Sequence, residues 1–247
     1  MQCLTLIQPD WPAPPTVRAV STLRCGGVSR EPYDTFNLAA HVGDDPEAVR
    51  ENRARLRTAL RLPNEPCWLE QVHGDSVVEA NVCSQPPRAD ACVARAHGQV
   101  CVILTADCLP VLFCSRSGDR VAVAHAGWRG LAAGILDNTV GSLGLPGHDV
   151  MAWLGPAIGQ AAFEVGDDVR VAFLARDSGI AAAFQPNARG RWQCDLYELA
   201  RRNLARLGVE AVYGGGYCTF NDAERFFSYR RDGQCGRMST LVWLENP

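Results

Sequence analysis

Three side chains along the sequence have the chemistry to bind a metal ion. His73 and His125 each end a run typical of a strand, and Cys108 lies in a break between two apolar runs. Two imidazoles and one thiolate form a three-ligand set that suits zinc and leaves a fourth position open for a reactant. The intervals of 35 and 17 residues are too long to carry ligand-spacing information. A buried thiol with two hydrogen-bonded histidines is therefore the alternative interpretation of the same residues.

Glycine-rich and arginine-rich segments near these residues offer places for an anion. Gly127 follows the strand that ends at His125, and a helix starting there would leave backbone N–H groups free for phosphate, with Arg129 beside them. Arg230 belongs to a second concentration of arginines and is a weaker candidate. The same residues also suit structural roles, because glycine allows close packing and arginine pairs with carboxylates of the fold.

The surrounding sequence predicts strands and helices that mix without strict alternation. Strands are expected at 100–105, 111–114, 121–125 and 150–154, with shorter ones at 68–73, 77–78, 209–213 and 241–244. Helices are expected from Pro46 to about Leu60 behind an Asp45 cap, over 127–143, over 167–175, and from Asp195 to near Gly208. We therefore predict an α+β fold with mixed β-sheets, as a single compact domain over residues 1–247.

Composition and charge narrow the possible function classes. The 247 residues carry a net charge of −3, and all 24 cations are arginines, because the sequence contains no lysine. That absence rules out lysine Schiff-base chemistry and a P-loop lysine, and the weak negative charge argues against nucleic acid as a partner. The sequence contains no apolar stretch of membrane-helix length and begins without a signal-peptide pattern. We expect a cytoplasmic protein whose 11 cysteines are reduced and mostly small core residues.

Several catalytic signatures are missing from the sequence. It contains no H-E-x-x-H, no G-x-S-x-G and no H-x-E with P-C-x-x-C, which argues against the corresponding metalloproteases, serine hydrolases and cytidine deaminases. The 5 histidines are scattered and include no H-x-H pair, so they cannot supply the imidazoles of a multicopper cluster.

Motifs spread over nearly the whole chain are similar to those of one family. They are Arg24–Ser29, Asn37–Leu38, His41–Asp45, Gln71–Gly74, Thr105–Cys108, His125–Gly130, Gly155–Gly159, Phe163–Gly166, Arg225–Asp232 and Gly236–Met238. In this order they make the chain resemble the YfiH-like family, also called the laccase-domain or polyphenol oxidase family. Its members are described as zinc-dependent purine nucleoside phosphorylases.

This resemblance implies a layered mixed α/β fold, with β-sheets flanked by helices, and a zinc site. His73, Cys108 and His125 are the implied metal ligands and catalytic residues, with copper possible in vitro. The implied reaction is phosphorolysis of adenosine, inosine and methylthioadenosine to the free base and (methylthio)ribose 1-phosphate, with adenosine deamination as a side activity. The expected partners are small-molecule purine nucleosides and phosphate, with neither nucleic acid nor membrane. The protein is expected to be a monomer or a weak homo-oligomer.

Other functions stay open at this point. In a metal-free cysteine hydrolase, Cys108 would be the nucleophile and His125 the base. The family also resembles cysteine hydrolases in fold. Some of its members are linked to peptidoglycan editing, which implies amides of cell-wall precursors as the substrates. A copper-dependent polyphenol oxidase, or laccase, is suggested by the family's older name, although the histidine count argues against it. A non-catalytic binding module would bind ligands without converting them.

Overall fold

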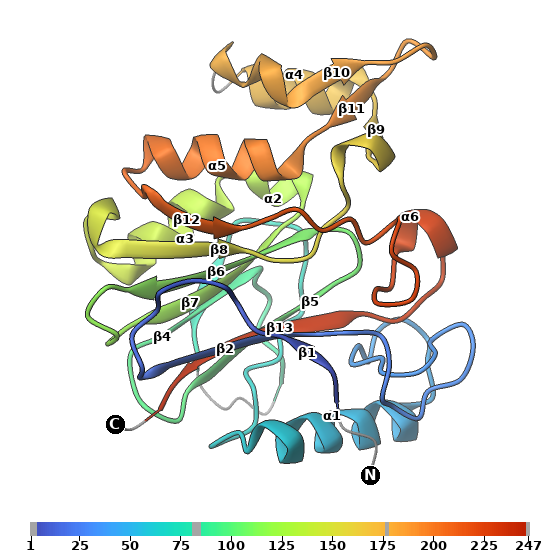
Figure 1. Ribbon diagram of the computed structural model, residues 1–247, viewed down its shortest axis with the longest axis vertical. Coiled ribbons are helices and arrows are strands. Elements are labelled where there is room, and N and C mark those ends of the chain that lie inside the picture. The colour runs from blue at the N-terminus through green and yellow to red at the C-terminus, as the bar shows by residue number, and fades with distance from the viewer. Residues whose placement is uncertain (1–3, 81–84, 176–177, 246–247) are drawn as a thin grey trace.

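The computed structural model describes residues 4–80, 85–175 and 178–245. Its elements stack in layers along the long axis, from α1 (Pro46–Leu60) at one end to α4 (Asp167–Leu174) at the other (Figure 1). A four-stranded sheet, a six-stranded sheet and a layer of helices lie between these ends. Over the described ranges, no helix is both long and apolar enough to cross a bilayer.

Two sheets form the centre of the molecule. The four-stranded sheet has the order β1 (Leu6–Ile7), β2 (Val17–Thr22), β13 (Met238–Leu244) and β5 (Val100–Thr105). The six-stranded sheet has the order β12 (Ala211–Gly214), β8 (Val150–Leu154), β6 (Leu109–Ser115), β7 (Val121–Ala126), β4 (Ala91–Ala94) and β3 (Val77–Glu79). Its two outer pairs, β12 with β8 and β3 with β4, are parallel, and the inner pairs are antiparallel. The sheet is therefore mixed, as the sequence predicts.

Helices cover the outer face of each sheet. Helices α2 (Trp128–Ala133), α3 (Ile135–Leu143) and α5 (Leu196–Arg206) lie beyond the six-stranded sheet, and α1 lies beneath the four-stranded one (Figure 1). Past α5, a small sheet of β9 (Glu164–Val165), β10 (Phe184–Pro186) and β11 (Trp192–Cys194) lies beside α4. Short helical turns occupy α6 (Tyr229–Asp232), η1 (Gly147–Asp149), η2 (Gln160–Ala162) and η3 (Ser178–Ala183).

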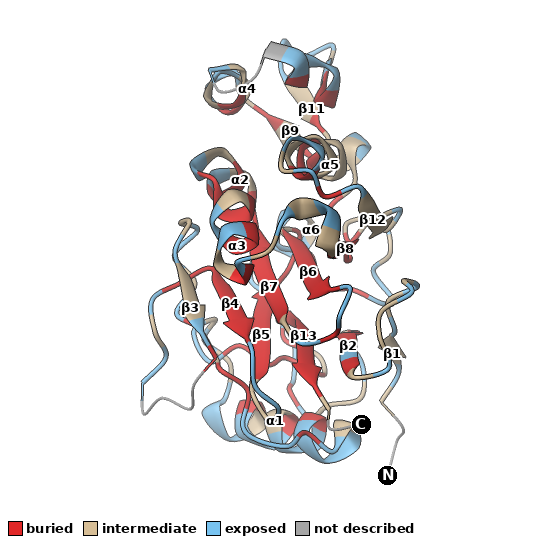
Figure 2. Cartoon of the chain, turned by 90° about the vertical axis from the view of Figure 1, so that its left-hand side faces the viewer, coloured by how far each residue is buried: buried red, intermediate tan, exposed pale blue. Residues whose placement is uncertain are grey.

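Alternation along the strands divides the core into layers. In β5, Val100, Val102 and Leu104 pack on the α1 side, whereas Cys101 and Ile103 face the six-stranded sheet. In β7 the alanines pack toward the helices, and Val121 and Val123 face the space between the sheets. Figure 2 shows that strands β4 to β8 and β13 are buried along their whole length, whereas the outer strands β1, β3 and β12 are not. His125 follows the same alternation and is thereby placed on the inter-sheet face, at the end of β7.

Cysteine side chains contribute to this core, as the sequence analysis expects. Of the 9 described cysteines, Cys67, Cys92, Cys101, Cys114, Cys194 and Cys235 are buried. Four of these six, Cys67, Cys92, Cys101 and Cys114, belong to the cluster between the two sheets. Small side chains on this face let the two sheets approach each other.

The structure confirms the mixed fold class and corrects two predicted elements. Residues 68–73 do not form a strand; only an isolated bridge between Glu70 and Arg88 is present there. The predicted helix over 127–143 is two helices, because Gly134 adopts a left-handed φ of 111° that ends α2 and begins α3. The apolar pattern is continuous across this break because both helices cover the same sheet face. The domain bounds of 1–247 stay a prediction, since both ends lie outside the described residues.

Candidate metal centre

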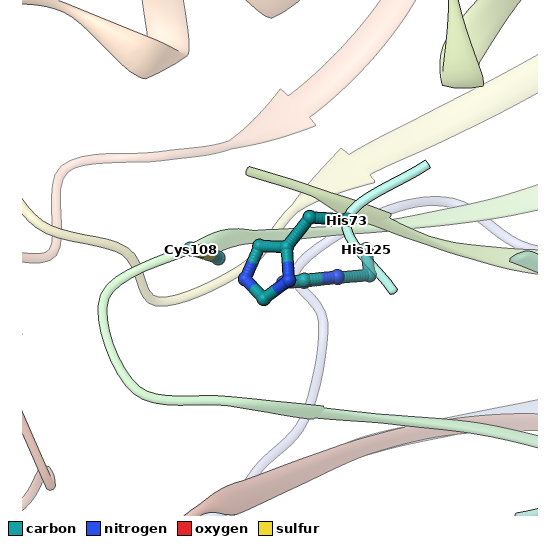
Figure 3. A group of neighbouring side chains, drawn as sticks. All are labelled: His73, Cys108 and His125. Atoms are coloured by element: carbon teal, nitrogen blue, oxygen red, sulfur yellow. The ribbon is translucent and has the colours of Figure 1, made fainter. Parts of the chain in front are cut away.

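The structure brings His73, Cys108 and His125 together, although they come from three separate segments (Figure 3). Cys108 directly precedes β6, and His125 lies near the end of β7. Because these strands are antiparallel and Leu109 pairs with Ala126, the start of one strand meets the end of the other. One donor atom from each of the three side chains lies within 4.8 Å of the other two.

His73 reaches this position from the loop before β3. Its φ of 59° lies in the left-handed region, which is uncommon for a residue with a side chain. The carboxylate of Asp90 stabilises this loop by accepting hydrogen bonds from three consecutive backbone N–H groups, those of Val72 (3.1 Å), His73 (2.9 Å) and Gly74 (2.7 Å). Asp90 directly precedes β4, which pairs in parallel with β3, so the loop and the carboxylate lie at the same end of the sheet.

His125 is oriented by the same carboxylate. Its Nδ1 atom lies 2.8 Å from Oδ1 of Asp90, and its backbone N–H donates to the Asp90 carbonyl oxygen at 2.7 Å. A carboxylate only accepts hydrogen bonds, so the ring carries a proton on Nδ1 and presents Nε2 to the site. The ring is buried and packs edge-on against His73, with the ring centroids 4.8 Å apart.

The electrostatics of the site favour a negatively charged Cys108 beside a positively charged His125. Burial alone would raise the pKa of the Cys108 thiol, but His125 and His73 outweigh this effect and lower that pKa to about 6. Burial would likewise lower the pKa of His125, but Cys108 and Asp90 raise it to about 9. For Asp90, the hydrogen bonds from His125 and the backbone outweigh burial and lower the pKa of the carboxyl. In the metal-free protein, the two histidines therefore favour the thiolate form of Cys108.

Two neighbouring backbone segments, at Gly127 and at Asp107, confine Cys108. A Cβ atom at position 127 would lie 2.8 Å from the Cys108 sulfur, so the chain passes the thiol with no room for a side chain. On the other side, Asp107 has a φ of 91°, and its buried carboxylate accepts hydrogen bonds from the Thr219 hydroxyl (2.6 Å) and the backbone N–H of Arg230 (2.7 Å). Both Asp107 oxygens thus hold the turn before Cys108 in place.

The three residues singled out for an anion lie in different surroundings. Gly127 borders the donor set, because a Cβ atom added there would lie 2.8 Å from the Cys108 sulfur. Arg129 is exposed and its guanidinium lies 4.3 Å from the ring centroid of Trp128. Arg230 is exposed too, but its guanidinium donates to the Glu164 carbonyl oxygen at 2.9 Å and so has a structural partner. Helix α2 has only 6 residues, so its dipole would contribute little to binding an anion. Of the three residues, Arg129 is therefore the main candidate for binding phosphate.

Asp90 is the part of the site that sequence reasoning missed. It lies in the run Ala89–Ala94, and all the remaining residues of this run are apolar. An isolated acid in an otherwise apolar run is rarely buried without partners, and this is the signal that could have identified it. Asp90 is completely buried, and it has four hydrogen-bond donors around its two oxygens.

The donor set fits a metal ion with three protein ligands. Its members are a thiolate and two imidazoles, one of them held by a carboxylate, which is the usual surrounding of a zinc-bound histidine. Ligand atoms of a tetrahedral zinc site lie roughly 3.3–3.8 Å apart, so donors within 4.8 Å of one another need small shifts to bind an ion. His73 is exposed and Cys108 is half-buried, which leaves the open side of the set toward solvent.

Comparisons with known proteins show what the chain is similar to. A family model described as multi-copper polyphenol oxidoreductase laccase matches residues 18–245. A protein of Pseudomonas aeruginosa named purine nucleoside phosphorylase is 58% identical over 241 residues, which cover 97% of this chain and 98% of that protein. The purine nucleoside phosphorylase YfiH of Escherichia coli is 52% identical over 242 residues, with 97% and 98% covered.

Solved structures agree over the same length. A crystal structure of a Neisseria meningitidis protein has a TM-score of 0.95 and 49% sequence identity, and covers 98% of this chain and 99% of that one. YlmD from Geobacillus stearothermophilus has a TM-score of 0.92 at 29% identity, with 100% and 98% covered. The layers described above are thus shared along the full length of these proteins.

Proposed function

Because the chain belongs to the YfiH-like family, whose model carries the laccase description, we propose that it is a zinc-dependent purine nucleoside phosphorylase. The proposed substrates are adenosine, inosine and methylthioadenosine, each cleaved by phosphate to the free base and (methylthio)ribose 1-phosphate. The observation that carries the proposal is the convergence of His73, Cys108 and His125 within 4.8 Å, in a chain 58% identical to a protein named purine nucleoside phosphorylase.

His73, Cys108 and His125 would hold the zinc ion, which when bound supplies a Lewis acid at the open side of the set. The residues around it then have separate tasks. The two histidines lower the pKa of Cys108, which favours the thiolate, and His125 would release its Nε2 proton to solvent when the ion binds. Asp90 keeps the proton of His125 on Nδ1. Gly127 leaves the space that the thiolate needs.

Phosphate and nucleoside would bind on the exposed side of the donor set. Arg129 is the proposed phosphate residue, because it is exposed and follows Gly127 by two positions. Arg230 is the second candidate, because its backbone N–H donates to Asp107, the residue before Cys108. In the reaction a phosphate oxygen forms a bond to the anomeric carbon while the bond from that carbon to the purine nitrogen breaks. The bonding electrons leave with the purine, which takes up a proton.

Adenosine deamination is proposed as a side activity of the same site. Water replaces the exocyclic amino group at the purine C6 position, which yields inosine and ammonia. The proposed setting is the cytoplasm, and the proposed partners are small molecules alone. The oligomeric state stays a prediction of monomer or weak homo-oligomer.

The test is release of hypoxanthine from inosine by zinc-loaded protein, with and without phosphate, followed by chromatography. The proposal expects hypoxanthine and ribose 1-phosphate in equal amounts, only when phosphate is present. A chelator should abolish the release, and added zinc should restore it. Release of free ribose without phosphate would instead identify a nucleoside hydrolase. No release under any of these conditions would overturn the proposal.

One observation favours a second candidate function. Asp90, His125 and Cys108 form a continuous chain of acid, base and thiolate, which is the arrangement of a cysteine hydrolase. Such an enzyme would act on amides of cell-wall precursors without a metal. A covalent adduct on Cys108 during turnover by metal-free protein would support it. The third donor, His73, has no task in that mechanism, and we therefore prefer the metal centre.

A copper-dependent polyphenol oxidase is the function that the family model's description names. Over the described ranges, the structure brings together one group of at least three metal-binding side chains, His73 with Cys108 and His125. Multicopper oxidation requires further copper ligands next to the first set. Oxidation of a phenol by protein carrying one copper ion per chain would nevertheless favour this function over phosphorolysis.

A further inference from the structure

We infer that Asp90 is a positioning residue for the metal site, because it fixes the ring of His125 and the backbone of His73 so that both face one ion. The inference rests on the metal site of the proposed function and is independent of phosphorolysis. Asp90 touches neither the open side of the donor set nor any reacting atom. Its effect passes entirely through the two histidines.

The first support is how the Asp90 carboxylate shares its two oxygens. Oδ1 accepts from the backbone N–H of His73 at 2.9 Å and from Nδ1 of His125 at 2.8 Å. Oδ2 accepts from Val72 at 3.1 Å and Gly74 at 2.7 Å. Oδ1 therefore connects the two histidines directly, although they are 52 residues apart in the sequence (125 − 73 = 52).

The second support is the tautomer of His125. Imidazole binds a metal through one nitrogen only when that nitrogen carries no proton. Asp90 accepts a hydrogen bond at Nδ1, so Nε2 is the nitrogen left for the ion. A carboxylate partner also makes the imidazole a stronger ligand, because it stabilises positive charge on the ring.

The third support is the conformation of His73. Its left-handed φ of 59° costs free energy for a residue with a side chain and persists only where the surroundings enforce it. Three consecutive N–H groups directed at one carboxylate enforce it here. Without them the loop loses the contacts that hold His73 in this conformation.

The burial of Asp90 indicates that its carboxylate serves the metal site and not the packing of the sheet. Asp90 has no exposed surface, and removing a carboxylate from water is costly unless its partners repay the cost. Its chain neighbours Ala89 and Ala91 are buried apolar residues, and an apolar side chain would continue that pattern. All four partners of the carboxylate belong to His73, its two neighbours or His125.

The direct test is zinc affinity of Asp90→Asn, measured by competition with a chromophoric chelator. Asparagine keeps the shape of the side chain but replaces one carboxylate oxygen with an NH₂ group. Two of the four N–H groups that now bind the carboxylate would then face this NH₂ group instead of an acceptor. We expect the affinity to fall about 10–100-fold, as is typical when a partner of a metal ligand is lost. The cobalt-substituted variant should also show an altered visible spectrum, because the ligand geometry changes.

Two control variants separate positioning from stability. Val93→Ala removes apolar volume from β4, which Asp90 directly precedes, so it lowers stability while leaving the carboxylate in place. Asp195→Asn changes a carboxylate that also accepts two backbone N–H groups, at the start of α5. Both should bind zinc like the wild type. The inference is overturned if Asp90→Asn does so too, or if Val93→Ala loses as much affinity.

A second measurement needs no variant and so does not depend on folding of Asp90→Asn. Nitrogen-15 NMR of the zinc-loaded wild type should show a protonated Nδ1 and a metal-bound Nε2 for His125. Zinc bound through Nδ1 would refute the inference. Tight zinc binding without nucleoside turnover would refute the proposed function alone, whereas unchanged binding by Asp90→Asn would refute this inference alone. Failure of the wild type to bind zinc would refute both.

Discussion

Gly127 and Cys108 are in such close contact that a Cβ atom at position 127 would lie 2.8 Å from the Cys108 sulfur. The backbone of Gly127, with φ −64° and ψ 162°, is open to any residue. The conformation therefore does not require glycine, but the thiol beside it does. The same added atom would lie 3.6 Å from Cδ2 of His73, which is an ordinary contact.

Gly127→Ala should consequently damage the metal site through Cys108 alone. Because the thiol must move aside, we expect zinc affinity to fall at least tenfold, with a loss of stability of about 1–3 kcal/mol from overpacking. Zinc titration and chemical denaturation of the two proteins measure these effects. Gly141→Ala is the matched control, because a Cβ there meets nothing within 4 Å. That variant should bind zinc normally and be stabilised by about 0.5–1 kcal/mol, since alanine favours a helix interior.

Cys108→Ala should abolish stoichiometric zinc binding and phosphorolysis while the fold is retained. The substitution removes one of three donors but little volume, so the stability cost should be about 1 kcal/mol. Metal analysis after gel filtration, circular dichroism and the inosine assay report the three properties. Cys25→Ala, which changes an exposed cysteine, should behave as wild type in all three. Full turnover by Cys108→Ala would mean that the three donors are not the active site.

Alkylation of Cys108 in the metal-free protein should have an unusual pH dependence. The thiolate is the reactive form, and the neighbouring histidines lower the pKa of Cys108 to about 6. The rate should therefore be nearly constant above neutral pH and fall as pH drops through about 6. Iodoacetamide labelling of the peptide that contains Cys108, followed by mass spectrometry, measures this, with N-acetylcysteine as the reference. A midpoint near the ordinary value of about 8.5 would contradict the proposed ion pair, and bound zinc should suppress the reaction.

Arg129→Ala should affect phosphate more than nucleoside. Loss of one charge-assisted hydrogen bond, at about 1.5–3 kcal/mol, corresponds to a rise in KM for phosphate of roughly 10- to 150-fold. The KM for inosine should change little. Steady-state kinetics with each substrate varied in turn separates the two effects. Arg116→Ala is the control, because Arg116 lies in the turn between β6 and β7, at the far end of these strands from Cys108. An unchanged phosphate KM would remove Arg129 from the proposed site.

Some elements could be predicted from the sequence because local chemistry determines them. Strands β5 and β8 have the predicted bounds, since a short continuous apolar run of strand length favours a buried strand. Helix α1 also begins and ends where predicted, with the Asp45 side chain accepting from the Glu47 N–H. The short strands of the small sheet and β4 were not predicted, because their pairing depends on partners distant in the sequence.

The same division applies to the candidate site. His73, Cys108 and His125 are recognisable by residue type, and the family resemblance selects them as a set. At the end of the strand predicted over 68–73, the N–H groups of Val72 and His73 bind Asp90 in place of a neighbouring strand. Neither the left-handed backbone of His73 nor the tautomer of His125 has a local cause. Both follow from one side chain that the sequence places among alanines.

The cysteine-lined layer between the two central sheets makes the protein sensitive to oxidation when the sheets separate. Cys67, Cys92, Cys101 and Cys114 share one core cluster, so an opening that separates the sheets brings four sulfurs into water at once. Oxidants that spare the closed molecule would then react with several neighbouring positions, and the resulting disulfides or sulfinic acids would prevent the sheets from closing again. During storage under air, the protein should therefore lose activity at a rate set by how often the two sheets separate. A reductant should preserve the activity for longer than zinc alone does.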